Sequence, residues 1–360
     1  MSLAAELASL NLVEVDPTEL FGTAKVTCGG NNLQVNSLVL KEGNLYFISD
    51  PNGNIPGREP CHLGLFHEDT RFLSRWDLTL HKHEPIVLSA QANRVFCNQI
   101  DLTTSFSERV QDIYEHNYIH IRRRQALGGV LVERLRISNY LNFVQRVQFT
   151  IHFAADFADM FEVRGVERKR RGTYYRPIVS KDRVLLCYKG LDGVMRSTRI
   201  VFDKPPTSIN ERAAEWQIAI PPGSSFLLEA HVIPLIEGEK EEDSTPSYAA
   251  VYEHISTDYA QWRRDCSRFI ADDEFLTSSL AQSVTDLRAL AVEYQGQRLV
   301  SAGLPWYTTA FGRDSIITSL QTLIVNPDIA RDTLLFMARY QGTKTDDFTV
   351  EEPGKILHEI

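Results

Sequence analysis

The sequence lacks the short motifs that are typical of nucleotide-binding proteins and of serine hydrolases. Its 360 residues contain no GxGxxG or Walker loop and no GxSxG. The five cysteines are odd in number, lie far apart and form no CxxC, so reduced thiols in a cytosolic protein are expected. We therefore expect no cofactor.

A secretory leader and a membrane-spanning run are also missing. The first twenty residues have no basic start, Glu6 and Glu14 interrupt their apolar character, and no stretch approaches about 18 uninterrupted apolar residues. The net charge of −9 argues against attraction to nucleic acid or to a membrane surface. We expect a cytoplasmic protein with neither as a partner.

Residues 33–236 carry the pattern of an antiparallel β-sandwich. Apolar and polar residues alternate, as in strands with one buried face, over 131–137, 147–153 and 226–232. Segments rich in turn-forming residues separate such runs at 50–57, 127–129, 190–193 and 221–223. The length predicts two large sheets, preceded by a partly disordered lead-in over residues 1–32.

The hydrophobic period changes to that of helices after an acidic segment at 237–247. We expect an acidic linker and a linking helix over 237–272, and the start of a helical domain over 273–360. Apolar positions predict helices over 248–262, 276–291, from about Asp314 to Ile324, and over 329–340. Three or four helices are too few to bury these apolar faces. We therefore expect the chain to be the N-terminal part of a longer protein, or to have a docking partner.

The segment LPWYTTAFGRDSIITSL, residues 304–320, holds the main candidate site. In the simplest structural interpretation Asp314 is the N-cap of a helix that begins at Ser315, and Arg313 is a solvated neighbour. A fixed carboxylate beside a guanidinium can also accept hydrogen bonds from, and donate them to, adjacent sugar hydroxyls. Trp306 and other upstream aromatic residues would supply an apolar face for a pyranose ring.

Three other segments carry residue types found at functional sites, and each has an ordinary structural explanation. HKHE, residues 81–84, offers metal-binding side chains, but a solvated turn is the favoured interpretation, and no metal is expected. RGVERKRRG, residues 164–172, could be a phosphate or polyanion patch, but an exposed loop is the favoured interpretation in an acidic chain. Some of its arginines could also pair with acids across a domain interface. GLFHEDTRFLSRWDL, residues 64–78, places Asp69 and Arg71 at the start of a strand, as a surface ion pair.

Six stretches of the sequence carry a family resemblance. They are SDPNGNIPG, GLFHEDTRFLSRWDL, GGVLVERLRISNY, FAADFADMFEVRG, AGLPWYTTAFGRDSIITSLQTL and EEPGKILHE. GLFHEDTRFLS and LPWYTTAFGRDS are the most specific of them. Together they make the sequence similar to the bacterial glycogen debranching enzyme family, of the amylo-α-1,6-glucosidase type, from about residue 40 to the end.

The resemblance implies a β-rich plus α fold, in which an N-terminal super-β-sandwich precedes an (α/α)6 barrel of the six-hairpin glycosidase type. Only the first helices of that barrel would be present here. The resemblance also implies that an Arg-Asp pair binds hydroxyls of the terminal glucose and does not donate the proton. The implied substrate-binding residues are Trp306, Arg313, Asp314, Lys355, His358 and Glu359.

Enzymes of this kind resemble inverting glycosidases, in which two carboxyl groups stand about 6.5–9.5 Å apart to leave room for a water molecule. In the family these carboxylates lie in later parts of the barrel, so the catalytic residues are expected beyond Ile360. Spacing alone also permits Asp314 and Glu359 as a substitute pair, which is the less favoured interpretation.

The sequence therefore predicts the N-terminal part of a glycoside hydrolase that cleaves α-1,6-glucosidic branches of glycogen or a related α-glucan. Its expected partners are the glucan and the remainder of the barrel, in cis or in trans, with self-association through exposed barrel helices. The alternative is a non-catalytic module that binds glucan or another protein.

Overall fold

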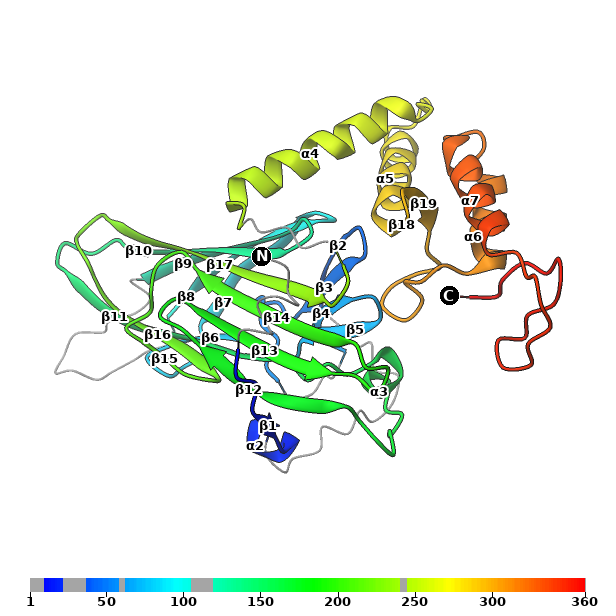
Figure 1. Cartoon of the computed structure of the whole chain (residues 1–360). Coiled ribbons are helices and arrows are strands. Elements are labelled where there is room, and N and C mark those ends of the chain that lie inside the picture. Colours follow the sequence, from blue (N-terminus) through cyan, green and yellow to red (C-terminus); the bar gives the residue numbers. More distant parts are fainter. Residues whose placement is uncertain (1–9, 22–36, 58–61, 105–118, 240–244, 360) are drawn as a thin grey trace. The chain divides into compact units, whose positions relative to one another are not determined.

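The computed structural model describes residues 10–21, 37–57, 62–104, 119–239 and 245–359. The chain divides into two compact units, one comprising Met1–Leu40 and Tyr46–Val251 and the other Lys41–Leu45 and Tyr252–Ile360. Figure 1 shows strands dominating the first unit and helices the second. Within the described residues, none of the helices combines the length and the hydropathy that a membrane span requires.

A nine-stranded antiparallel sheet forms the larger layer of the first unit, in the order β1-β12-β13-β14-β17-β10-β9-β8-β7. Its strands are β1 (Glu14–Val15), β7 (Ile86–Arg94), β8 (Cys97–Thr103), β9 (Ile119–Leu127), β10 (Leu131–Asn139), β12 (Thr173–Val179), β13 (Arg183–Lys189), β14 (Met195–Phe202) and β17 (Ser225–Ile236). The alternation predicted over 131–137 and 226–232 is confirmed in β10 and β17, which pair with each other. Burial alternates over 119–124 of β9 and 133–137 of β10, because one face of the sheet meets the core.

A four-stranded antiparallel sheet packs on this layer, in the order β15-β16-β11-β6. Its strands are β6 (Arg75–Leu80), β11 (Gln145–Ala154), β15 (Ser208–Ile209) and β16 (Ala213–Ile220). Phe149 of β11 lies 5.9 Å from Phe226 of β17, and Trp216 of β16 lies 5.0 Å from Phe202 of β14, between ring centroids. These aromatic contacts join the two sheets into the predicted sandwich.

Smaller elements complete the first unit. A further sheet has the order β2-β3-β4-β5, from β2 (Leu38–Glu42), β3 (Leu45–Ser49), β4 (Gly64–His67) and β5 (Thr70–Leu73); of these residues, Lys41, Glu42 and Leu45 are counted with the second unit. Two short helices are α2 (Pro17–Phe21) and α3 (Met160–Val163). Much of the expected lead-in lies outside the described residues, but β1 forms the edge of the nine-stranded sheet by pairing with β12, and Phe21 of α2 packs edge-on against Tyr174.

The second unit contains helices and one hairpin. They are α4 (Tyr248–Asp265, which begins in the first unit), α5 (Glu274–Leu290), β18 (Ala291–Tyr294), β19 (Gln297–Val300), α6 (Gly312–Gln321) and α7 (Asp328–Arg339). One core cluster gathers Trp262, Val284 and Ile329, and another gathers Leu299 and Phe336. All four predicted helices are present, but the hairpin β18–β19, which follows α5 directly, was not predicted. A complete (α/α)6 barrel is not seen in the described residues.

Candidate functional site

The main candidate site lies at the first turn of α6. The helix begins at Gly312, and its N-cap is Phe311, whose side chain makes no capping hydrogen bond. The prediction that Asp314 caps a helix beginning at Ser315 is therefore wrong. The chain turns helical three residues earlier, because the amide of Ser315 already bonds to the Phe311 carbonyl. Asp314 lies inside the first turn, where its negative charge still interacts favourably with the positive end of the helix dipole.

A segment near residue 358 crosses the beginning of α6. The Gly312 amide donates to the His358 carbonyl at 2.9 Å, and Phe311 forms an isolated β-bridge with Glu359. A Cβ atom on Gly312 would lie 2.0 Å from the Leu357 carbonyl oxygen, so only glycine permits this crossing. The requirement for glycine at position 312 was not recognised in the sequence.

Aromatic rings stand next to this crossing. The Phe311 ring packs edge-on against Tyr307, at 5.9 Å between centroids, and against His358, at 6.3 Å. Trp306 is half-buried in the loop that leads to α6. The ammonium of Lys355 donates to the Val350 carbonyl within its own loop. The structure thus brings His358 and Glu359 to the start of α6, whereas Lys355 is engaged by its own loop.

Arg313 and Asp314 present polar atoms at this point. Their closest polar atoms, Nε and Oδ2, are 3.9 Å apart, which makes a loose ion pair. The side chains are 77% and 41% exposed, so both retain hydrogen-bonding capacity for a ligand. A guanidinium and a carboxylate held on one helical turn can together bind two neighbouring hydroxyl groups, one as donor and one as acceptor.

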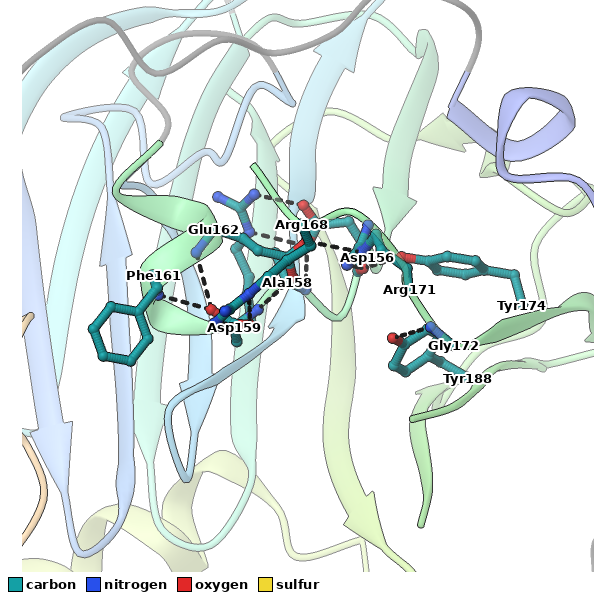
Figure 2. Close-up of polar contacts among 11 residues, drawn as sticks. Asp156, Ala158, Asp159, Phe161, Glu162, Arg168, Arg171, Gly172, Tyr174 and Tyr188 are labelled. Atoms are coloured by element: carbon teal, nitrogen blue, oxygen red, sulfur yellow. Dashed lines mark hydrogen bonds and ion pairs between the residues drawn. The ribbon is translucent and has the colours of Figure 1, made fainter. Parts of the chain in front are cut away.

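A second polar cluster, drawn in Figure 2, surrounds α3 on the sandwich. Asp159 and Glu162 form a capping box, in which each side chain accepts from the other residue's amide. Arg168 pairs with Asp159 at 2.7 Å and Arg171 with Glu162 at 3.0 Å. Burial raises the pKa of the Glu162 carboxyl, although Arg171 opposes the change.

The basic segment 164–172 is thereby tied to its own unit. In the cluster drawn in Figure 2, Arg171 also lies over the ring of Tyr174 and donates to the Asp156 carbonyl, and the Arg168 guanidinium lies over the ring of Phe161. The expected pairing with acids across a domain interface is therefore wrong for Arg168 and Arg171, whose partners come from α3 and its cap. Segment 164–172 is therefore a loop that the contacts of Arg168 and Arg171 hold against α3 and its neighbours.

Arg71 makes a buried ion pair and not a surface one. Its guanidinium holds Asp156 in two parallel bonds, Nε to Oδ1 at 3.0 Å and Nη2 to Oδ2 at 2.5 Å. Burial acts to raise the pKa of Asp156, but the Arg71 charge and hydrogen bond outweigh it and the pKa is lowered. The predicted strand start is confirmed, since β5 begins at Thr70 after the left-handed turn at Glu68 and Asp69. The predicted surface ion pair is wrong, because Arg71 is buried and pairs with Asp156.

A third network fills the core between the sheets. Arg123 and Glu133 are 1% and 2% exposed and pair at 2.7 Å, and Trp76 and Gln125 each donate to Glu133 at 2.8 Å. Arg123 also donates to the backbone carbonyl of Asn52. These bonds satisfy a buried charge pair and fix the turn at residues 50–57. The pairs Arg71–Asp156 and Arg123–Glu133 thus hold together segments that the sequence alone showed only as stretches of family resemblance.

One cluster among the described residues has the composition of a cation site. His67, Glu68 and Glu239 place ligand atoms within 4.8 Å of one another. Within the described part of the chain the other ring nitrogen of His67, Nδ1, is buried without a hydrogen-bond partner. A metal-bound histidine normally donates from its second nitrogen, so this geometry does not fit a settled metal centre. The HKHE segment contributes nothing to this cluster, and His81 and Lys82 adopt left-handed turn conformations.

A cavity of about 330 Å³ opens elsewhere in the second unit. Its lining includes Trp262, Asp265, Arg298 and Asp332, from α4, β19 and α7. None of the six predicted binding residues lines it. The α6 site is therefore an exposed helix start and not part of this cavity.

Comparison with known families gives one match. Residues 40–231, more than half of the chain, match the family described as the N-terminal domain of some glycogen debranching enzymes. The matched range contains both Arg71 and Glu133, and it ends before α6. No curated protein matches the sequence.

Solved structures include similar folds. A proposed kojibiose phosphorylase from the human microbiome has a TM-score of 0.58 at 9% identity, over 78% of this chain and 40% of that one. This chain therefore spans less than half the length of that protein, and at such low identity the likeness shows the fold alone. A proposed aldose 1-epimerase from Escherichia coli K12 has a TM-score of 0.34 at 8% identity, over 56% of this chain and 99% of that one. A score that low supports no conclusion about this chain.

Proposed function

The chain belongs to the glycogen debranching enzyme family through its N-terminal domain, and we propose that it is part of a glycoside hydrolase that cleaves α-1,6-glucosidic branches. In this proposal the sandwich is the family's N-terminal domain and the second unit begins the catalytic (α/α)6 barrel. The family match supports a glucan substrate, and the arrangement at α6 supports the site.

The observation that carries the site is the crossing of α6 by the segment 357–359. It places His358 and Glu359 against Phe311 and Gly312, the residues directly before Arg313 and Asp314, although the two pairs are more than 40 residues apart in sequence. We assign the first pair to hydroxyl groups of a terminal glucose. The rings of Phe311 and Tyr307 provide apolar surface beside them.

Bond cleavage by inversion needs a general acid and a general base on opposite sides of the sugar ring. We place both carboxylates in later helices of the barrel. Asp314 is then a binding residue, and its exposed carboxylate beside Arg313 can accept a hydrogen bond from a sugar hydroxyl. The substitute pair of Asp314 and Glu359 is the weaker alternative.

Exposed apolar side chains on the second unit support the proposal that further helices cover it. Leu320 is 68% exposed and Leu334 is 59% exposed. An apolar cavity of about 530 Å³ also opens beside α5 and the end of α4, lined by residues such as Phe269 and Leu280. Surfaces of this kind are rare on monomers and mark interaction sites. The same observation favours the alternative function, a module that docks on another protein.

The proposal is tested with the enzyme that contains this chain, by measuring glucose release from a branched limit dextrin. Asp314→Asn and Arg313→Ala should each raise KM or lower kcat/KM by about tenfold or more, as expected for losing a charge-assisted hydrogen bond to substrate. Asp328→Asn and Arg331→Ala are matched controls, because these residues form an exposed pair in the first turn of α7.

Equal activity of the Asp314→Asn and Asp328→Asn enzymes would rule out the binding role. Glucose release by residues 1–360 alone would contradict the placement of the acid and base in later helices. A protein that binds glucan but releases no glucose under any condition would favour the non-catalytic module.

A further inference from the structure

The outward face of the nine-stranded sheet carries an ordered group of polar and aromatic side chains. Burial alternates along β9, so Ile121 and Arg123 enter the core while His120 and Arg122 reach the surface. The register sets Arg122 opposite Asp101 of β8 on one side and opposite Arg136 of β10 on the other. Side chains from three strands therefore meet at one level of the sheet.

Hydrogen bonds hold this group in place. Asp101 accepts from Arg122 Nε at 2.8 Å and lies 2.8 Å from His120 Nε2. Arg136, which is exposed, donates from Nε to the Ser225 hydroxyl at 3.2 Å. Side chains fixed in this way lose little conformational entropy when they bind a ligand.

An exposed tyrosine stands at one end of the group. The Tyr140 side chain is 71% exposed, and its ring centroid lies 6.1 Å from that of His120. The turn that carries it is fixed by Asn139, which donates to the carbonyls of Phe143 and Ile220 and accepts from the Leu141 amide. A large aromatic ring is thus presented to solvent on a rigid support.

The group continues along the strands for one more level. Arg124 of β9 donates to Gln99 at 2.9 Å. Arg134 of β10 pairs with Glu229 at 2.6 Å, and Tyr248 partly covers this pair, because its ring lies over Arg134 and its amide donates to Glu229. The three levels marked by His120, Arg122 and Arg124 along β9 span about 14 Å at the usual rise of a strand. That length suits a short chain of sugar units better than a single small molecule.

The chemistry of the group favours a neutral, hydroxyl-rich ligand over a polyanion. Of its four arginines, Arg122 and Arg134 are already neutralised by carboxylates, and Arg124 is bound by an amide oxygen. Their remaining N–H groups are oriented donors more than unpaired charges. Asp101 adds an acceptor beside them, and Tyr140 adds a face on which a sugar ring can stack.

We propose that this face, defined by Asp101, His120, Arg122, Arg136 and Tyr140, is a binding surface for an α-glucan chain. The inference rests on the proposed function, because the ligand class is that of the proposed substrate. The sandwich would then hold a branched polymer by one of its chains while a chain end is processed elsewhere, which would raise the local concentration of chain ends.

The test is co-sedimentation with glycogen and calorimetric titration with maltoheptaose. Tyr140→Ala should weaken binding roughly three- to tenfold, the range expected for an aromatic contact. Arg136→Ala should weaken it as well, and Tyr140→Phe, which keeps the ring, should bind almost normally. Phe161→Ala and Arg183→Ala serve as controls, because both residues are exposed on the same unit and neither belongs to this group; Arg183 is on β13, which β14 and β17 separate from β10.

The outcomes separate this inference from the proposed function. Reduced glycogen binding by Tyr140→Ala, with unchanged glucose release from a small soluble dextrin, supports the surface. Unchanged glycogen binding by both Tyr140→Ala and Arg136→Ala overturns it and leaves the proposed function untouched. Binding of heparin but not of maltoheptaose at the same residues also overturns it. If the unaltered protein neither binds glucan nor releases glucose, both proposals fail.

Discussion

Arg71 and Asp156, which lie 85 residues apart in the sequence, form two parallel hydrogen bonds inside the sandwich. The first residue comes from the strand β5 and the second from the segment that leads into α3. The same aspartate accepts, through its backbone carbonyl, from Tyr174 at 2.5 Å and Arg171 at 2.8 Å. One residue therefore joins three separate parts of the sandwich.

Removing the carboxylate of Asp156 should strongly destabilise the first unit. Asp156→Ala leaves the Arg71 guanidinium, of which the side chain is 10% exposed, buried without its charge partner, which costs about 3–5 kcal/mol. Urea unfolding followed by circular dichroism measures the loss. Asp182→Ala is the control, because its pair with Arg183 is exposed and should change stability by less than about 1 kcal/mol. A loss of similar size in both variants would contradict a special role for the buried pair.

Because Lys41 is buried, we expect the free energy of unfolding to rise at alkaline pH. Its side chain is 2% exposed within the second unit, and burial lowers its pKa to about 8, with Arg288 adding to the effect and Glu42 opposing it. Below pH 8 the folded and unfolded states both bind the proton, so the cost of the buried charge is fully present. Between pH 8 and about 10 only the unfolded state keeps the proton, so the free energy of unfolding rises with pH.

Lys41→Met should remove that rise. Urea unfolding at about pH 7.5, 8.5 and 9.5 gives the slope for each protein, and the two slopes should differ by up to about 1.4 kcal/mol per pH unit. Lys344→Met is the control, because Lys344 is exposed and its pKa is raised by Asp346. Parallel curves for the Lys41→Met variant and the unaltered protein would show that Lys41 does not titrate in this range.

Gly312→Ala should displace the segment that crosses α6. The added methyl group would meet the Leu357 carbonyl oxygen, which is backbone and cannot rotate away. We expect faster amide hydrogen exchange over 356–359 and weaker substrate binding, while the helix itself gains from the alanine. Gly296→Ala is a poor comparison because that residue has a positive φ, so Ser278→Ala in the exposed part of α5 is the control. Unchanged exchange over 356–359 would show that the crossing is not required.

The exposed face of α6 and α7 should drive association of the 360-residue chain. Leu320→Glu with Leu334→Glu replaces two exposed leucines by charges, at little cost to folding because neither is buried. Sedimentation velocity over a range of concentrations should show less association for this double variant. Leu191→Glu, on an exposed turn of the sandwich, is the control. Equal association of all three proteins would place the contact elsewhere.

The sequence predicted the sandwich and the helices well because both depend on local periodicity. Alternation over 147–153 predicted β11 directly, since one face of that strand is buried and the other is not. The hairpin β18–β19 was missed because its four-residue strands are too short to show a period, and α5 runs into it without a break. The start of α6 was misplaced because Phe311 is an unusual N-cap, whereas Asp314 is of a favoured type.

The polar networks could not be predicted from the sequence for a different reason. Arg71, Arg123 and Arg171 are charged residues in strands or loops, where exposure is the ordinary expectation. Their acidic partners lie between 9 and 85 residues away, and only the fold brings them together. The pair Arg313–Asp314 was found because its residues are neighbours, yet its roles in binding remain predictions.

The position of β17 in the nine-stranded sheet has a consequence for how the chain folds. This strand is the last of the sandwich to be synthesised, and it lies between β10 and β14, pairing with both. Until residues 225–236 arrive, β10 and β14 each present an unpaired edge, and the sheet consists of two separate halves. Such edges invite pairing with other chains. The sandwich must therefore fold late and cooperatively, and an interrupted translation product that stops before β17 would be prone to aggregation.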